Sequence, residues 1–272
     1  MGRHLRFAVA VLAGLVTFPL SGPAETLKIG GTGAVTALLQ DMAGAFGRVA
    51  PDDRLEVIPG LGSSGGIAAA EAGAITLAVT GRALRESERA AGLLVVPFLE
   101  TPFVFAASTG VSLSLSRSDL IGIYTGALVA YPDGAPLRLI LRPRSDAQTL
   151  MMVRHIEGMA AALETARLRS ELPVAGNDQD NMDLARRLEG AFGGFPLTQL
   201  ASEANTFRHV VIDGVAPTLE EMREGRYPYR LQVDFVSKGP PSAAARRFLA
   251  FLASPEAAAM IEKAGAIRVR AP

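Results

Sequence analysis

Short apolar segments with strand-like composition alternate with segments of helical spacing along nearly the whole chain. The first strand is centred on Leu27 and Ile29, and apolar residues from Val35 to Phe46 then recur at helical intervals. The same reading predicts further strands at 55–58, 75–79, 93–98, 137–141, 210–212 and 231–235, weaker ones at 174–175 and 195–200, and further helices at 66–72, 86–91, 116–124, 147–169, from 242 and from 254. Because helices that cross between neighbouring strands build a parallel sheet, this order predicts an α/β fold.

One stretch interrupts the alternation. Pro97 and Pro102 bracket a crossing region, and the apolar run Phe103–Ala107 follows them. A chain of 272 residues can form one large domain or two medium lobes. We expect two lobes, with residues 25–102 and 233–272 in lobe 1 and residues 103–232 in lobe 2.

Residues 1–24 have the composition of a secretory signal peptide. Arg3, His4 and Arg6 form a positive start, Phe7–Leu20 is an apolar run, and Ser21–Ala24 is small and polar. The run is too short to cross a bilayer comfortably. This pattern favours cleavage near Ala24 and a periplasmic mature protein over a membrane anchor.

The overall composition argues against several classes of partner. Lys plus Arg and Asp plus Glu both number 27, and only 6% of residues are aromatic. Neither a global positive field nor a stacking platform is present, so nucleic acid is not an expected partner. The chain has no cysteine, which excludes disulfides and thiolate metal sites.

Glycine- and hydroxyl-rich turns follow four of the predicted strands. In a parallel sheet such turns lie together at the carboxyl ends of the strands, where ligands bind, and exposed amides at helix starts favour an anion. The turns therefore predict an anion site between the lobes. Its candidate residues are Thr32, Gly33 and Ala34; Ser63, Ser64 and Gly65; Thr80, Gly81 and Arg82; and Arg142, Arg144, Ser145 and Asp146.

Two other site types fit parts of the sequence less well. Ser64 lies in a G-x-S-x-G pattern that a serine hydrolase could use, but the base would have to be His155 or His209, and only two strands precede the serine. The acidic run from Asp178 to Asp183 contains possible metal ligands, but it lacks the glycine and glutamate of a calcium loop. We expect this run to be a solvated helix start. No catalytic residue, metal or cofactor is predicted.

At these turns the chain resembles the phosphate-binding proteins of ABC transporters, which are type II periplasmic binding proteins. The resembling segments span most of the chain after residue 24. They are GGTGAVTALLQDMAGAF at 30–46, IPGLGSSGGIAAAEAGAITLAVTGRAL at 58–84, SRSDLIGIYTG at 116–126, IDGVAPTLEEMREGRYPY at 212–229 and FLASPEAAAMIEKAGAI at 251–267. The resemblance implies two α/β lobes with mixed, mainly parallel sheets joined by crossing strands, and hinge closure on a solute. It also implies a monomer that delivers the solute to a membrane permease.

Three positions depart from the family pattern. Ala34 replaces a hydroxyl residue, and Gly81 stands where the phosphate proteins place an acidic proton acceptor. Asp146 falls at about the position of a ligand serine, and its carboxylate would repel an anion if it faced one in a poorly screened cleft. Ser63 and Arg142 keep the family's serine and arginine.

The expected function is therefore capture of a small solute, phosphate or another oxyanion, for an ABC transporter. Two alternatives stay open: a divergent binding protein for another small molecule, and a hydrolase built on Ser64. If Asp146 turns away from the ligand, we expect its carboxylate to be bound by the amides of Gln148 and Thr149 or by Arg144.

Overall fold

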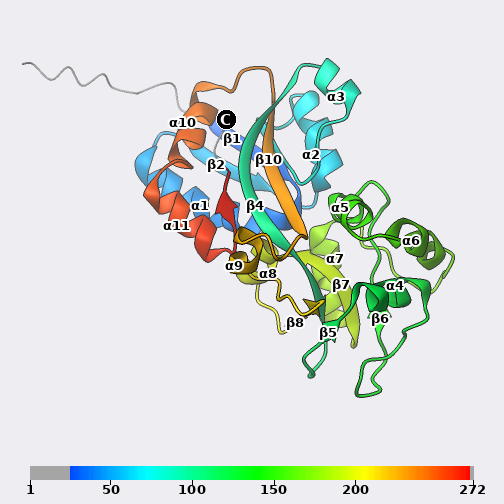
Figure 1. The fold of residues 1–272 in the computed structure, drawn as a ribbon. Coiled ribbons are helices and arrows are strands. Elements are labelled where there is room, and N and C mark those ends of the chain that lie inside the picture. The colour runs from blue at the N-terminus through cyan, green and yellow to red at the C-terminus, as the bar shows by residue number, and fades with distance from the viewer. Residues whose placement is uncertain (1–24, 270–272) are drawn as a thin grey trace, which may run out of the picture.

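A computed structural model describes residues 25–269 of the chain (Figure 1). The predicted signal peptide, residues 1–24, lies outside the described residues. The first elements are β1 (Thr26–Gly31), the 3-10 helix η1 (Gly33–Val35), α1 (Thr36–Val49), β2 (Arg54–Ile58), α2 (Gly62–Glu71), β3 (Leu77–Thr80), α3 (Glu86–Ala90) and β4 (Leu93–Ala107). The middle elements are β5 (Ser114–Leu115), α4 (Arg117–Thr125), β6 (Arg138–Leu139), α5 (Ala147–His155), α6 (Met159–Arg167), α7 (Asp178–Arg187), β7 (Ala191–Pro196) and α8 (Leu197–Ser202). The last are β8 (Arg208–His209), β9 (Val211–Ile212), α9 (Leu219–Arg223), β10 (Arg230–Lys238), α10 (Ala243–Phe251), α11 (Pro255–Lys263) and β11 (Ile267–Arg268).

The main sheet is mixed, and this confirms the predicted α/β class. Its strand order is β2-β1-β3-β10-β4-β7-β6, with β8 and β11 also paired to β4. Strand β1 is parallel to β2 and β3, and β6 is parallel to β7. Every antiparallel pair in this sheet involves β4 or β10. These two long strands make the sheet less parallel than the strand–helix alternation predicts.

Strand β4 runs without interruption through both Pro97 and Pro102. It pairs with β10 along 93–102 and with β7 along 103–107. A shift in register between Val233 and Asp234 lies opposite Pro97, at a point where the proline has no N–H for the ladder. The stretch predicted as a crossing region is therefore part of one long strand.

Separate hydrophobic cores lie on either side of the middle of β4. One contains Phe98 and Leu99 with residues of α1, α10 and α11, and the other contains Phe103 and Phe105 with residues of α4, α5 and α6. A smaller cluster between α2 and β3 covers the opposite face of the first part of the sheet. We propose that one lobe boundary lies at 102/103, between these cores. The expected boundary at 232/233 does not follow from them, because Leu231 packs in the first core.

Four predicted elements differ from the structure. The weak strand predicted at 174–175 is only an isolated bridge between Val174 and Leu141. The helix predicted at 147–169 is two helices, because the backbone is extended at Ile156 and Gly158 adopts a φ of 80° before α6 begins. The segment 195–200 ends strand β7 at Pro196 and then forms α8. Helix α2 begins at Gly62, four residues before the predicted start, so the glycine–serine turn forms its first turn. Small residues carry little periodic signal, which explains this last difference.

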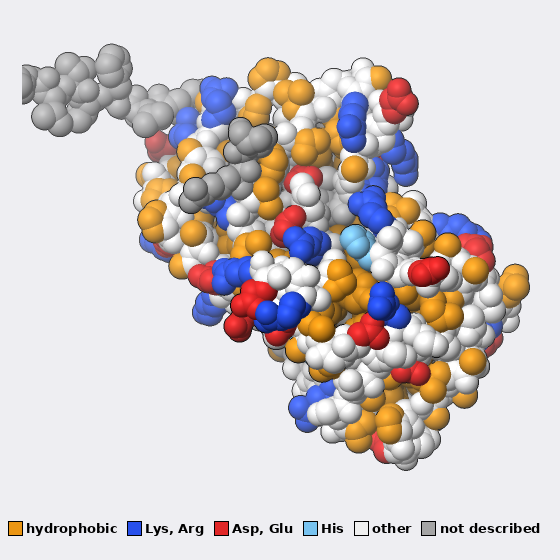
Figure 2. Space-filling model, viewed as in Figure 1, with side chains coloured by type: hydrophobic (Ala, Val, Ile, Leu, Met, Phe, Trp, Pro, Cys, Tyr) orange, Lys and Arg blue, Asp and Glu red, His pale blue; other side chains and the backbone are white. Residues whose placement is uncertain are grey.

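Two features of the described residues concern a possible membrane span: the charges on the surface and the length of the helices. On the face shown in Figure 2, basic and acidic side chains are interspersed. Within residues 25–269, none of the helices has the length and apolar character needed to cross a bilayer.

Candidate functional site

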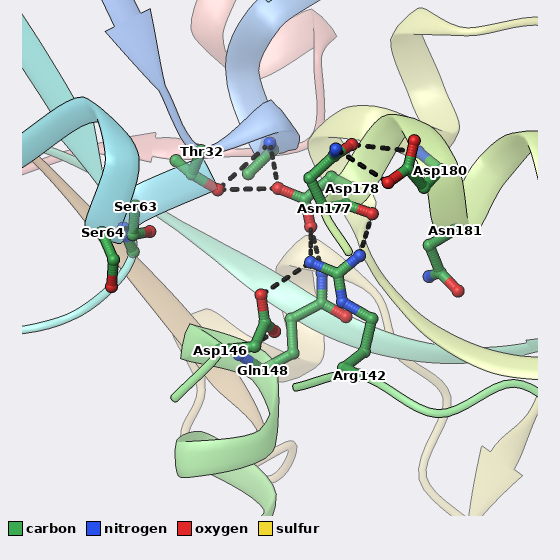
Figure 3. A network of polar contacts seen from close by, with 12 residues as sticks. Thr32, Ser63, Ser64, Arg142, Asp146, Gln148, Asn177, Asp178, Asp180 and Asn181 are labelled. Atoms are coloured by element: carbon green, nitrogen blue, oxygen red, sulfur yellow. Dashed lines mark hydrogen bonds and ion pairs between the residues drawn. The ribbon is translucent and has the colours of Figure 1, made fainter. Parts of the chain in front are cut away.

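Residues from two of the predicted turns, together with Gln148, meet around one buried carboxylate, that of Asp178 (Figure 3). Asp178 Oδ2 accepts hydrogen bonds from Thr32 Oγ1 at 2.8 Å and from the Ala34 amide at 3.1 Å. Its Oδ1 accepts from Gln148 Nε2 at 2.5 Å and from an Arg142 terminal nitrogen at 3.2 Å. We call these four donor residues the anion cradle. The Asp178 side chain is only 4% exposed, so the hydrogen bonds of the cradle, rather than water, stabilise its negative charge.

The local fold explains why the start of α7 reaches this place. Thr32 follows β1 and caps η1, and its hydroxyl and the Ala34 amide both donate to Asp178 at the start of α7. A Cβ on Gly33 would lie 2.6 Å from the Asp178 Cβ, so only glycine permits this approach. Thr198 of α8 also donates to the Ala34 carbonyl at 2.5 Å. The turn Thr32–Ala34 is therefore packed tightly against the starts of α7 and α8.

Arg142 is buried and serves two carboxylates. One of its terminal nitrogens donates to Asp146 Oδ2 at 2.6 Å as well as to Asp178, and another donates to the Asn177 carbonyl. Burial lowers the pKa of Arg142, but Asp178 and Asp146 outweigh this, and its pKa is raised overall. The guanidinium stays charged and holds the network together.

Asp146 caps helix α5 and turns away from the solvent. Its Oδ1 accepts from the Gln148 amide at 3.0 Å, as we expect for a helix cap, while its Oδ2 accepts from Arg142 rather than from Arg144. Burial raises the pKa of Asp146, Arg142 opposes this, and the nearby Asp178 raises it further. Two carboxylates therefore share one buried cation.

We predict that Asp146 makes the folded protein less stable as the pH rises. Its pKa is raised in the folded state, so between about 3.9, the ordinary pKa, and its raised value the folded state binds more protons than the unfolded chain. The variant Asp146→Asn keeps a capping side chain without this titration. Urea unfolding from acid to neutral pH should show the variant gaining stability relative to wild type as the pH rises. A stability difference independent of pH would contradict the prediction.

The acidic helix start was misjudged from the sequence. Asp178 and Asn181 are 3% and 1% exposed, so the prediction of a solvated helix start is wrong for both. Asn177 does cap α7 through the Asp180 amide, in agreement with a helix start. The sequence signal shows where the helix begins but not which lobe surface the helix faces.

Ser63, Ser64 and Arg82 form a second polar group beside the cradle (Figure 3 shows the serines). Ser63 Oγ accepts from the Gly81 amide at 3.0 Å, and Ser64 Oγ accepts from Arg82 Nε at 3.2 Å. Arg82 also makes a bidentate pair with Glu88 at 2.8 and 2.9 Å. This bond lowers the pKa of Glu88 to about 2, against the effect of burial. The charge of Arg82 is thus compensated within the protein.

The remaining predicted residues lie at different depths. Thr80 is buried, and its hydroxyl bonds the backbone of Arg82. Gly65 lies in the first turn of α2. Arg144 and Ser145 are exposed, and Arg144 pairs with Glu164 rather than joining the cradle. The structure therefore does not bring Arg144 and Ser145 to the anion cradle.

Gly81 lies against Ala147 of α5 and Leu231 of β10. A Cβ at this position would be 3.2 Å from the Ala147 Cβ and 3.3 Å from the Leu231 methyl groups. A larger acidic side chain would meet this apolar wall. The absence of an acid at residue 81 therefore agrees with the local packing.

Neither a hydrolase nor a metal site is supported by the geometry. The Ser64 hydroxyl accepts hydrogen bonds from Arg82 and from no histidine in the described residues. Among residues 25–269, no group of three or more His, Asp or Glu side chains is arranged to hold a metal ion.

Comparisons with known proteins agree with this picture. The family model described as a PBP superfamily domain matches residues 19–256. A structure from Clostridium perfringens, described as a phosphate ABC transporter substrate-binding protein with bound phosphate, is 21% identical with a TM-score of 0.78 and covers 90% of this chain and 100% of its own. A phosphate-binding protein from Stenotrophomonas maltophilia is 14% identical with a TM-score of 0.66 and covers 90% and 91%. An ABC-type phosphate transport receptor from Vibrio cholerae is 19% identical with a TM-score of 0.60 and covers 90% and 100%. A search of curated proteins found no match.

At these identities the solved structures establish the fold, and the family model establishes the family. The matched region contains all the predicted site residues and both long strands. The family and these neighbours are substrate-binding proteins without enzymatic activity. The chain therefore belongs to the PBP superfamily, the periplasmic binding proteins, and has the fold of its type II members.

Proposed function

We propose that this protein captures a small solute between its lobes for a membrane ABC permease, and that free inorganic phosphate is not its preferred solute. The family supports the solute-binding role. The observation that carries the second part is the Asp178 carboxylate, which occupies the anion cradle. The cradle donors that would bind an oxyanion are already satisfied within the chain.

Charge makes replacement of Asp178 by phosphate unfavourable. A phosphate in the cradle would have to displace Asp178 and would still face Asp146, which is bound to the same guanidinium. Buried like charges repel strongly where water does not screen them. Arg82 offers no compensation, since Glu88 neutralises it, and Gly81 offers no acceptor for a phosphate proton. The Asp178 carboxylate instead holds the lobes together, because it joins Thr32 of lobe 1 to α7 of lobe 2. We call this contact the Asp178 latch.

Export and partners belong to the same proposal. The pattern of residues 1–24 supports secretion to the periplasm. Relatives described as ABC transporter proteins support delivery to a permease. We propose that the protein acts as a monomer, closing on its solute by hinge motion about β4 and β10.

Calorimetric titration of phosphate into the purified protein tests this function. We expect wild type to show a Kd above about 1 mM. Asp178→Ala should bind phosphate at least about tenfold more tightly, because it frees four donors and removes a negative charge. Asp183→Ala, on the exposed side of the same helix, is the matched control and should behave as wild type.

Two results would count against the proposal. One is micromolar binding of phosphate by wild type. The other is unchanged phosphate binding in Asp178→Ala, given a correctly folded variant.

A further inference from the structure

A groove beside the cradle has no role in the contacts described so far. It has a volume of about 490 Å³, which lies in the range of small-molecule sites. Its walls are the turn Gly81–Ala83 after β3 and the helix α5, and its floor is formed by β4 and β10. Figure 2 shows a histidine with basic and acidic side chains on the face between β10 and α5. We call this groove between Gly81–Ala83 and α5 the hinge groove.

The hinge groove is separate from the cradle and spans both proposed lobes. Gly81, Ala147 and Leu231 line the groove, whereas none of the four cradle residues nor Asp178 does. One wall follows β3 and the other is α5, so any hinge motion about β4 and β10 would change the width of the groove. A solute bound here would contact both proposed lobes, as trapping by lobe closure requires.

Asp234 supplies a buried negative charge on the floor of the groove. The residue is 9% exposed, and its carboxylate accepts one side-chain hydrogen bond, from Gln232 at 2.9 Å. Among residues 25–269, no Lys or Arg forms an ion pair with it. Burial raises the pKa of Asp234, and Glu100, another groove residue, raises it further against the effect of Gln232. A buried carboxylate without a cation is costly unless a ligand provides one.

Basic side chains line the same groove from α5 and β10. Arg154 is exposed and makes no ion pair in the described part of the chain, and Arg230 makes only a long contact of 3.5 Å with Glu100. His155 lies close to both: burial and then these two arginines lower its pKa. The groove therefore carries free positive charge as well as the buried carboxylate.

An apolar surface lies beside these charges. Leu150, Met151 and Leu231 line the groove, and Leu150 is 41% exposed. A side chain that is left exposed on a groove wall can be covered by the hydrocarbon part of a ligand.

We propose that the hinge groove binds a small zwitterion of amino-acid size, with its ammonium group at Asp234 and its carboxylate at Arg154 and Arg230. This inference rests on the proposed solute-capture function and names the solute class. The ammonium compensates the buried Asp234 charge, the two arginines bind the carboxylate, and Leu150 covers an aliphatic side chain. A free phosphate would satisfy the arginines but would leave Asp234 unpaired.

Thermal unfolding of the purified protein with each free L-amino acid is the test. At least one should raise the Tm, by about 5–10 °C when present at about 100 times its Kd. The N-acetyl derivative and the carboxamide of that amino acid each lack one charge, and neither should raise the Tm. Asp234→Asn should abolish the shift, and Arg154→Ala should weaken binding at least about tenfold.

The variants can be checked without a ligand. Asp234→Asn removes an unpaired buried charge, so the free variant should be at least as stable as wild type. Asp41→Asn, on the exposed side of α1, is the matched control and should keep the full shift. The inference is overturned if no amino acid raises the Tm, if the shift survives in Asp234→Asn, or if the N-acetyl derivative is as effective. None of these results bears on the phosphate titration, which tests the proposed function separately.

Discussion

Replacing Asp178 with alanine is expected to lower the free energy of unfolding by about 3–5 kcal/mol, the usual cost of breaking a buried ion pair. The loss should lower the Tm by roughly 6–20 °C in a protein of this size. The reason is that Thr32, the Ala34 amide and Gln148 lose their shared acceptor in a buried place. Thermal and urea unfolding of the variant measure the effect.

Formate and acetate provide a sharper readout for the same variant. Each carries one carboxylate and can enter the space that Asp178 leaves, so each should restore part of the lost Tm through mass action. Wild type and Asp183→Ala should not respond, because in both the Asp178 carboxylate still fills the cradle. Asp183 makes only an exposed contact with Arg186 at 3.5 Å, so its removal should cost less than about 0.5 kcal/mol. Equal stability of the two variants would refute the Asp178 latch.

Replacing Arg142 with alanine should be as costly, about 3–5 kcal/mol at neutral pH. Both Asp146 and Asp178 would then be left with little to balance their charges. The cost should shrink toward pH 4, since burial raises the pKa of Asp146 and its protonation removes one of the unpaired charges. Urea unfolding at acid and neutral pH measures this dependence.

Arg144→Ala is the matched control for Arg142→Ala. Arg144 is two residues away, and its pair with Glu164 is exposed at both ends, so its removal should cost far less stability than that of Arg142 at any pH. The double variant Arg142→Ala with Asp178→Ala should cost less than the sum of the single variants by about 0.5–3 kcal/mol. Additive costs, or an Arg142→Ala effect that does not change with pH, would contradict the shared network.

Local signals in the sequence predicted many element boundaries well. Ser116, Ser242 and Ser254 cap helices as their patterns indicate, because a capping hydroxyl and the first-turn amides lie within a few residues of each other. Local signals did not predict every break within a helix. The helix break at Gly158 was missed, since a single glycine in an apolar periodic stretch is compatible with a continuous helix.

The candidate site was predicted in part. Thr32, Ala34, Arg142 and Asp146 do lie together, because Asp178 binds Thr32, Ala34 and Arg142, and Arg142 also binds Asp146. The strands before these two turns, β1 and β6, are not neighbours in the sheet. Asp178 and Gln148 were not among the predicted ligands, although both bind in the cradle. Arg144 was included because it neighbours Arg142, yet its side chain turns to the surface.

The sequence by itself determined the α/β class, the family and the turns from which the site is built, because these depend on periodicity, capping and short motifs. Only the tertiary structure decided what fills the cradle and which charges remain free. Asp178 reaches Thr32 across 146 positions of the chain, and Asp234 lies on a strand whose register opposite Pro97 turns its side chain into the hinge groove. Such contacts depend on how elements far apart in the sequence pack together. A local sequence pattern cannot show that Asp178 binds an arginine while Asp234, within residues 25–269, is left without one.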